Sequence, residues 1–155
     1  MQQENAEGKC YFIRHAQCYY IGEWKDALPH GQGTAIYRDG SYYHGQFTQG
    51  EAHDKNGLLI LPNGAYYKGE TVDSKIDGRG VMREKIGEGE YVYTGDWRQG
   101  RPHGEGEERY DDGGSYIGSF VNGVKHCYDG DREVKEKSKD SNLRVATYIS
   151  GGEEP

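Results

Sequence analysis

Apolar residues, proline and long hydrophobic runs are all scarce in this chain. Hydrophobic residues make up 33% of the 155 residues, and there are only 3 Phe, 2 Trp and 4 Pro. Ordinary globular chains carry roughly 45–50% apolar residues. No run approaches the roughly 18 apolar residues of a membrane-spanning helix, and the first residues lack a secretory-signal pattern. We therefore expect no large aliphatic core and no membrane-spanning helix.

Cysteine is also rare. Its 3 copies, Cys10, Cys18 and Cys127, form no C-x-x-C pair. Unpaired thiols are typical of a reducing compartment. We expect an intracellular protein, with small packing or surface thiols, no metal and no cofactor.

Basic residues are outnumbered. The 19 Lys and Arg against 26 Asp and Glu give a net charge of −7. Proteins bind nucleic acids and anionic membranes through basic patches, and no such patch stands out in the sequence. We expect no nucleic-acid partner, and the charge disfavours a membrane as the main partner.

Glycine and tyrosine, by contrast, are abundant, with 25 and 14 copies. So much glycine argues against a helical bundle, because each helical glycine costs about 1 kcal/mol relative to alanine. The aromatic content argues against a disordered chain. The composition predicts an all-β, turn-rich protein that packs mainly through tyrosine.

A Tyr-x-Gly triplet recurs at intervals of 23 to 26 residues, and in four of the five units a Trp or Phe follows the glycine by two residues. The third unit has Thr71 at that position. The repeated aromatic residues, which pack the structure and could line a partner groove, are Tyr20, Trp24, Tyr43, Phe47, Tyr67, Tyr93, Trp97, Tyr116 and Phe120. The repeat glycines are Gly22, Gly31, Gly33, Gly45, Gly69, Gly78, Gly80, Gly95, Gly104, Gly106 and Gly118.

Each unit is predicted to be a two-stranded hairpin. In the first unit we expect strands over 20–25 and 32–38, a turn over 26–31, and a second turn at Asp39-Gly40. A period of 23 residues is too short for a β-α-β unit, which needs about 30. The expected fold is an elongated antiparallel array of stacked β-hairpins, in which neighbours must cover one another.

Glycine in the Tyr-x-Gly triplet leaves a flat notch in the strand. We expect an aromatic ring from a neighbouring hairpin to lie over it. The doublets Tyr19-Tyr20, Tyr42-Tyr43 and Tyr66-Tyr67 place one tyrosine on each face of the sheet. In the third unit, Thr71 and about three extra residues near 87–89 predict a weaker stack or a bulge.

The boundaries follow from the repeat. Residues 1–7 are expected to be flexible, 8–19 to be half a repeat, 20–128 to be the array and 129–155 to be a charged tail. Opposite charges four residues apart, such as Asp131 and Lys135, favour a short helix. Alternation over 143–149 then predicts a last strand that either caps the array or docks on a partner. Its facing residues are Leu143, Val145, Thr147 and Ile149.

Several residue patterns could support chemistry but also have ordinary structural explanations. Four histidines share one register, at His30, His53, His103 and His126. Repeats about 10 Å apart cannot share one metal ion, so we expect turn histidines that bond backbone groups. The Gly-x-Gly pairs match no nucleotide loop. The many carboxylates could include a catalytic pair, but we interpret them as residues that solvate the sheet. They include Glu88, Glu90, Glu107, Glu108, Asp111 and Asp112.

The pattern Tyr-x-Gly-x-Trp-x6-Gly-x-Gly-x6-Gly-x2-Tyr resembles the MORN repeat (membrane occupation and recognition nexus). The first unit, from Tyr20 to Gly33, and the fourth, from Tyr93 to Gly106, match it closely, and the resemblance covers about 120 of the 155 residues. It implies a non-catalytic scaffold, a subunit of a cytoskeletal or ciliary assembly such as a radial-spoke head. It also implies protein partners and self-association through open sheet edges.

Two alternatives remain open at this stage. The resemblance also suggests a phosphoinositide-binding membrane tether, for which Arg98, Arg101 and Arg109 are the best available basic residues. It suggests as well a regulatory module of an enzyme, which would have to act in trans, because the printed sequence leaves no stretch for a second domain.

Overall fold

The computed structural model describes residues 10–14, 16–129 and 132–136. Within this part of the chain, all regular structure belongs to one 13-stranded antiparallel sheet. The strands are β1 (Tyr11–Ile13), β2 (Cys18–Lys25), β3 (Leu28–Tyr37), β4 (Tyr42–Thr48), β5 (Glu51–Ala52), β6 (Asp54–Ile60), β7 (Tyr66–Val72), β8 (Lys75–Ile86), β9 (Gly89–Arg98), β10 (Arg101–Tyr110), β11 (Ser115–Val121), β12 (Val124–Asp129) and β13 (Arg132–Glu136).

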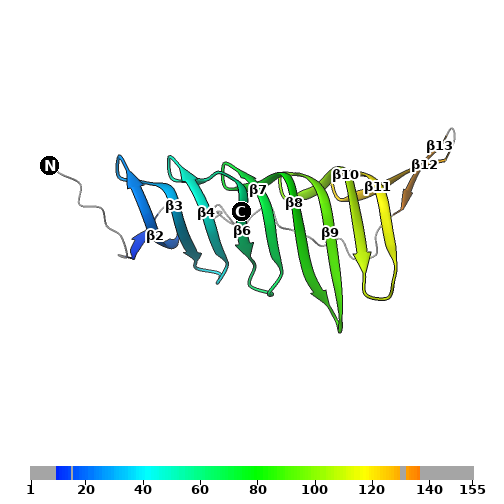
Figure 1. The fold of residues 1–155 in the computed structure, drawn as a ribbon, viewed down its shortest axis with the longest axis horizontal. Helices are drawn as coiled ribbons and strands as arrows, with labels where there is room; N and C mark the ends of the chain where they lie inside the picture. Colours follow the sequence, from blue (N-terminus) through cyan, green and yellow to red (C-terminus); the bar gives the residue numbers. More distant parts are fainter. Residues whose placement is uncertain (1–9, 15, 130–131, 137–155) are drawn as a thin grey trace.

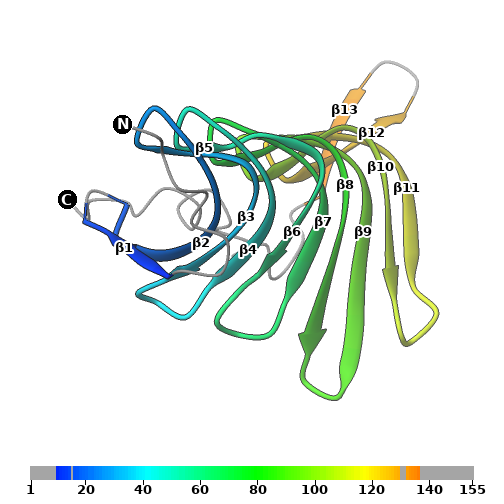
Figure 2. The same ribbon diagram turned by 60° about the vertical axis from the view of Figure 1, so that its left-hand side comes forward.

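The strand order in the sheet follows the chain, with the short β5 pairing only with β4. Figure 1 shows the strands side by side along the long axis of the molecule, and Figure 2 shows that the hairpins are bent. The predicted array of stacked hairpins is therefore confirmed. The flexible segment 1–7 and the docking strand 143–149, with Leu143, Val145, Thr147 and Ile149, lie outside the described residues.

The turn inside the first unit is shorter than predicted. Only Asp26 and Ala27 separate β2 from β3, and both have positive φ, 51° and 62°. The predicted turn over 26–31 is therefore wrong, and the strand predicted over 32–38 is present but begins four residues earlier, since β3 runs from Leu28 to Tyr37. A bulge, marked by a register shift between Gly22 and Trp24, accommodates the residues that resemble turn signals.

Each repeat tyrosine lies over glycine in its own hairpin. The Tyr20 ring covers Gly22 in the same strand and Gly33 in the paired strand, and a Cβ at Gly22 would lie 2.5 Å from the Tyr20 hydroxyl. The prediction of a ring from a neighbouring hairpin is wrong. Residues two apart on a strand share a face, so the ring folds down along its own strand where no Cβ obstructs it.

The second aromatic residue of each unit links adjacent hairpins. The Phe47 ring packs edge-on against Tyr20, at 4.9 Å between centroids, and against Tyr43, at 5.3 Å. Trp97 makes the same two contacts with Tyr67 and Tyr93, at 5.5 and 4.9 Å. Such pairs contribute about 0.5–1.5 kcal/mol each beyond their buried area. This edge-to-face series is how hairpins with few aliphatic residues exclude water.

The third unit replaces this ring contact with hydrogen bonds. The Thr71 hydroxyl lies 3.1 Å from the Tyr43 hydroxyl and accepts a bond from the Asp54 N–H at 3.1 Å. Thr71 is 1% exposed, so a buried polar contact stands where the other units have a ring.

The third unit contains a register shift between Gly69 and Thr71, but the extra residues near 87–89 form no bulge. The register between β8 and β9 runs without a shift from Gly78 opposite Trp97 to Ile86 opposite Gly89. The extra residues lengthen the two strands up to a turn at Gly87-Glu88. Lengthening adds regular hydrogen-bonded pairs, whereas a bulge would leave one residue unpaired.

The start of the tail is a strand and not the helix that its charges favour. Residues 132–136 form β13, paired with β12 from Lys125 opposite Glu136 to Asp129 opposite Arg132. Charge pairs four residues apart stabilise a helix by only tenths of a kcal/mol. Pairing along the open edge of β12 satisfies backbone groups that a short exposed helix would leave to solvent.

Candidate interaction surface

The aromatic residues of the repeat lie mainly in the core and not in an open groove. Seven of the nine are at most 4% exposed, and Trp24 and Tyr116 are partly buried against them. The hydroxyl groups are satisfied as well; Tyr20 and Tyr93 donate to the carbonyls of Glu23 and Asp96, both at 2.9 Å. Burial raises the pKa of Tyr20 to about 12. The two partly exposed members, Trp24 and Tyr116, lie on β2 and β11, so the set as a whole does not line one open groove.

The repeat glycines have two structural roles. Eight lie beneath a tyrosine ring of their own hairpin: Gly22, Gly33, Gly45, Gly69, Gly80, Gly95, Gly106 and Gly118. The other three have positive φ and face a carboxylate side chain: Gly31, Gly78 and Gly104. Both roles are structural, as expected for the Gly-x-Gly pairs.

The carboxylates beside those three glycines were not identified from the sequence. Glu23 accepts a hydrogen bond from the Gln32 N–H at 3.0 Å, and Asp96 accepts one from the Glu105 N–H at 3.2 Å. Glu70 does the same for Arg79 at 3.2 Å. The signal was present in the sequence, because an acidic residue directly follows the glycine of Tyr-x-Gly in these units. Each carboxylate satisfies a backbone donor exposed by the bulge.

The other face of the sheet carries a continuous row of side chains, one from each of ten strands, that sequence analysis did not assemble. Strand register places each member directly opposite the next. We call it the outer-face row: Phe12, Tyr19, Ile36, Tyr42, Ile60, Tyr66, Arg83, Val92, Arg109 and Ser115. The residues one position along each strand from these members point to the core face, and they include the buried tyrosines.

The first six members of the outer-face row are aromatic or isoleucine, from Phe12 to Tyr66. Tyr19 is 54% exposed, whereas Tyr20 is fully buried, so the tyrosine doublets do place a ring on each face as predicted. The solvated face of an antiparallel sheet is ordinarily polar. An apolar row that crosses six strands is therefore unusual, and exposed apolar patches mark interaction sites.

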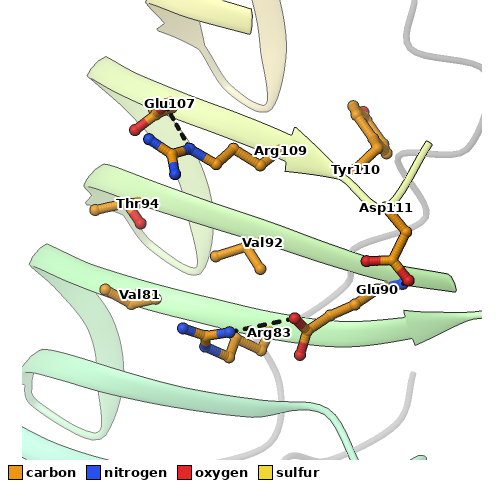
Figure 3. Close-up of a pocket in the computed structure, with 9 residues that line it drawn as sticks. All are labelled: Val81, Arg83, Glu90, Val92, Thr94, Glu107, Arg109, Tyr110 and Asp111. Carbon is orange, nitrogen blue, oxygen red and sulfur yellow. Dashed lines mark hydrogen bonds and ion pairs between the residues drawn. The ribbon is translucent and has the colours of Figure 1, made fainter. Parts of the chain in front are cut away.

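A pocket of ≈480 Å³ lies where the apolar part of the row ends. Figure 3 shows Arg83 and Arg109 on either side of Val92, with Val81 and Thr94 beside them. The remaining lining residues are Glu90, Glu107, Tyr110 and Asp111. This pocket is open and shallow, formed by side chains standing on a sheet face, and it continues the outer-face row.

Charges around the pocket are paired but exposed. Arg83 bonds Glu90 at 3.2 Å, and Arg109 bonds Glu107 at 2.7 Å. The hydrogen bond and charge of Glu107 raise the pKa of Arg109 above its usual value. Exposed pairs of this kind stabilise by about 0–1 kcal/mol, so both guanidinium groups can exchange partners. The row itself contains two arginines and no acidic residue, although the chain has a net charge of −7.

The three arginines named as the best available for membrane binding do not form one cluster. Arg98 and Arg101 face each other beside the turn between β9 and β10. Arg109 lies eight residues further along β10, about 26 Å away at the strand rise. No helix among the described residues combines the length and the apolar character that crossing a bilayer requires.

The candidate carboxylates are divided between the two faces. Glu90, Glu107 and Asp111 surround the pocket, whereas Glu108 is buried at 4% exposure on the core face. Over the described ranges, no group of three or more His, Cys, Asp or Glu side chains is placed to hold a metal ion. The expected turn position is wrong for three of the four histidines, since His30 lies in β3, His103 in β10 and His126 in β12. The expected backbone contact is present at His103, which accepts a hydrogen bond from the Asn122 N–H at 3.3 Å.

Glu108 forms a buried polar cluster that sequence analysis missed. It takes the core position held by Ala35, Leu59 and Met82 in the other hairpins. Its carboxylate lies 2.8 Å from the Lys125 ammonium and accepts a hydrogen bond from the Tyr91 hydroxyl at 2.9 Å. Burial and this carboxylate raise the pKa of Tyr91. The cluster fixes the last hairpins against each other with charge where the others use apolar contacts.

Comparison with known proteins identifies the repeat. The MORN repeat family model matches residues 20–42, 93–115 and 116–132. These stretches include the units that begin at Tyr20, Tyr93 and Tyr116. The two units between them depart from the pattern at single positions, since the second retains one glycine of the Gly-x-Gly pair and the third has Thr71.

Similar curated proteins are much longer than this chain. Human Alsin (Homo sapiens) is 26% identical over 130 residues, covering 84% of this chain and 6% of Alsin. The ALS2 C-terminal-like protein of Homo sapiens is 30% identical over 115 residues, covering 74% of this chain and 10% of that protein. The Bos taurus counterpart is 33% identical over 98 residues. The chain thus spans a tenth or less of these relatives.

Proposed function

The chain carries tandem MORN repeats, and we propose that it is a non-catalytic protein-interaction module, a scaffold subunit of a larger assembly. The MORN repeat is a non-catalytic repeat module that suggests protein or membrane association. The observation that supports a protein partner is the outer-face row, whose six apolar members from Phe12 to Tyr66 lie on the face opposite the core.

A cytoskeletal or ciliary location remains a prediction from the family resemblance. The names of the relatives, Alsin and ALS2 C-terminal-like protein, refer to neither a cilium nor an axoneme. The partners themselves are the direct test of location, because a set of axonemal or cytoskeletal proteins recovered in fixed proportion would identify the assembly.

Quantitative affinity purification tests the proposed function. The tagged chain is compared with the double variant Tyr19→Ser/Tyr66→Ser, whose substitutions lie on exposed strand positions, and with the control Lys75→Ser, at an exposed position outside the row. We expect the double variant to lose the partners that wild type and control retain in fixed stoichiometry. Equal recovery by all three chains, with matching thermal melts, would refute the assignment of binding to this surface.

A further inference from the structure

We propose that the outer-face row binds an amphipathic α-helix of a partner protein, with the helix's apolar stripe on the Phe12–Tyr66 part of the row and an acidic side chain above Val92. This rests on the proposed interaction function and adds the chemistry of the partner. Three features support it: the length of the row, the spacing of its members and the placement of Arg83 and Arg109.

The row has the length of an ordinary long helix. From Phe12 to Tyr66 it crosses five inter-strand spacings and from Phe12 to Val92 seven, which at about 4.8 Å each is about 24 and 34 Å. A helix rises 1.5 Å per residue, so these lengths correspond to about 16 and 22 residues. Figure 1 shows the strands running side by side over this whole distance.

The spacing also suits a helix. One helical turn advances 5.4 Å, close to the roughly 4.8 Å between adjacent strands. An apolar side chain on each turn of the helix therefore meets about one member of the row. An extended peptide would add at a sheet edge through its backbone, whereas an apolar sheet face is covered by another layer of structure, most simply a helix.

The two arginines of the row determine which end of the bound helix carries the acidic side chain. Arg83 and Arg109 are the direct cross-strand neighbours of Val92 on its two sides. Each is shown bonding one carboxylate beside the row, Glu90 or Glu107. A guanidinium group has five N–H donors, so both can also bond a carboxylate placed between them. A partner acid above Val92 would lie between the two guanidinium groups and would compete with Glu90 and Glu107 for them. The third carboxylate of the pocket, Asp111, accepts a hydrogen bond from the Glu90 N–H.

The test uses three stapled 22-residue helical peptides with a leucine stripe that differ only in the last turn, which carries Glu, Gln or Lys on the stripe. Fluorescence anisotropy measures binding to the full chain at low salt. We expect the Glu peptide to bind about tenfold more tightly than the Lys peptide, with Gln between them. Arg83→Glu/Arg109→Glu should reverse that order, and the control Arg98→Glu/Arg101→Glu should leave it unchanged. Tyr19→Ser/Ile36→Ser should weaken all three peptides about tenfold.

Each other result decides against the proposal. Equal affinity of the three peptides would overturn the role of the arginines. If no peptide binds, while affinity purification still recovers proteins in a way that depends on Tyr19 and Tyr66, the proposal of a helical partner is overturned and the proposed function is retained. Row-dependent binding to vesicles containing anionic lipid, without peptide binding, would assign the row to a membrane surface. Failure of both the peptides and the purification would overturn this inference and the proposed function together.

Discussion

Gly106 lies under the ring of Tyr93, and replacing it with alanine should be among the most damaging small changes available. A Cβ at Gly106 would lie 2.6 Å from Cζ and 2.7 Å from a ring carbon of Tyr93. The ring is fully buried and is held on two sides by edge-to-face contacts, with Trp97 at 4.9 Å and Phe120 at 5.1 Å. It cannot move aside without breaking those contacts.

The magnitude follows from these constraints. Forcing a methyl group into a packed core costs about 1–3 kcal/mol, and complete loss of a buried aromatic side chain costs about 3–5 kcal/mol. Because Tyr93 must be partly displaced, we expect Gly106→Ala to lower the free energy of unfolding by about 3 kcal/mol. Gly89→Ala is the matched control, since a Cβ there would meet its nearest atom at an ordinary 3.5 Å; it should change stability by less than about 1 kcal/mol.

Urea unfolding followed by tryptophan fluorescence measures both variants, because Trp97 lies against the ring concerned. A cycle with Tyr93→Ala adds a second check. Once the ring is absent, Gly106→Ala should cost little, so the two changes should be strongly non-additive. If Gly106→Ala matched Gly89→Ala within about 0.5 kcal/mol, the account of tyrosine rings packed on glycine would be refuted.

Four other predictions concern the turns, the buried carboxylate and the buried tyrosines. Ala27→Gly should raise the free energy of unfolding by about 0.5–1 kcal/mol, because Ala27 has a φ of 62°. Ser74→Gly, at a similar φ of 60°, should lower it, because it removes the hydroxyl bonded to the Ala52 N–H at 3.0 Å; urea titration measures both. Glu108→Ala removes the carboxylate beside the Lys125 ammonium and should cost about 3–5 kcal/mol, and Glu108→Met/Lys125→Met should recover most of it. Burial raises the pKa of Tyr43 to about 12, so the unfolded state ionises first. Stability present below pH 10 should therefore fall between pH 10 and 12, followed by circular dichroism and tyrosinate absorbance; a flat profile would contradict the burial of the tyrosines.

The fold could be predicted because the repeat encodes it locally. Tyr-x-Gly triplets every 23 to 26 residues specify a hairpin and its successor without reference to distant residues. The errors occurred where tertiary structure overrides a local signal. Pro29 and Gly31 resemble turn residues, yet they belong to β3, because Asp26 and Ala27 adopt positive φ in a tighter turn.

The interaction surface could not be predicted in the same way. Ile36 and Ile60 look like ordinary alternating strand residues, and they line up only through the register of successive strands. That register depends on the length of every turn between them. The assignment of Glu108 to solvation of the sheet was wrong, because it is buried. Nothing local distinguishes it from a surface carboxylate until its position is matched with Leu59 and Met82.

Site-specific photo-cross-linking in living cells tests the central claim most directly. A benzoylphenylalanine placed at Tyr66, in the outer-face row, is compared with one at Lys75, which is exposed outside the row. The account predicts a defined protein adduct from position 66 that is lost with Tyr19→Ser and is absent from position 75. The absence of an adduct at 66, or the same adduct from both positions, would contradict the claim that this face binds a protein partner.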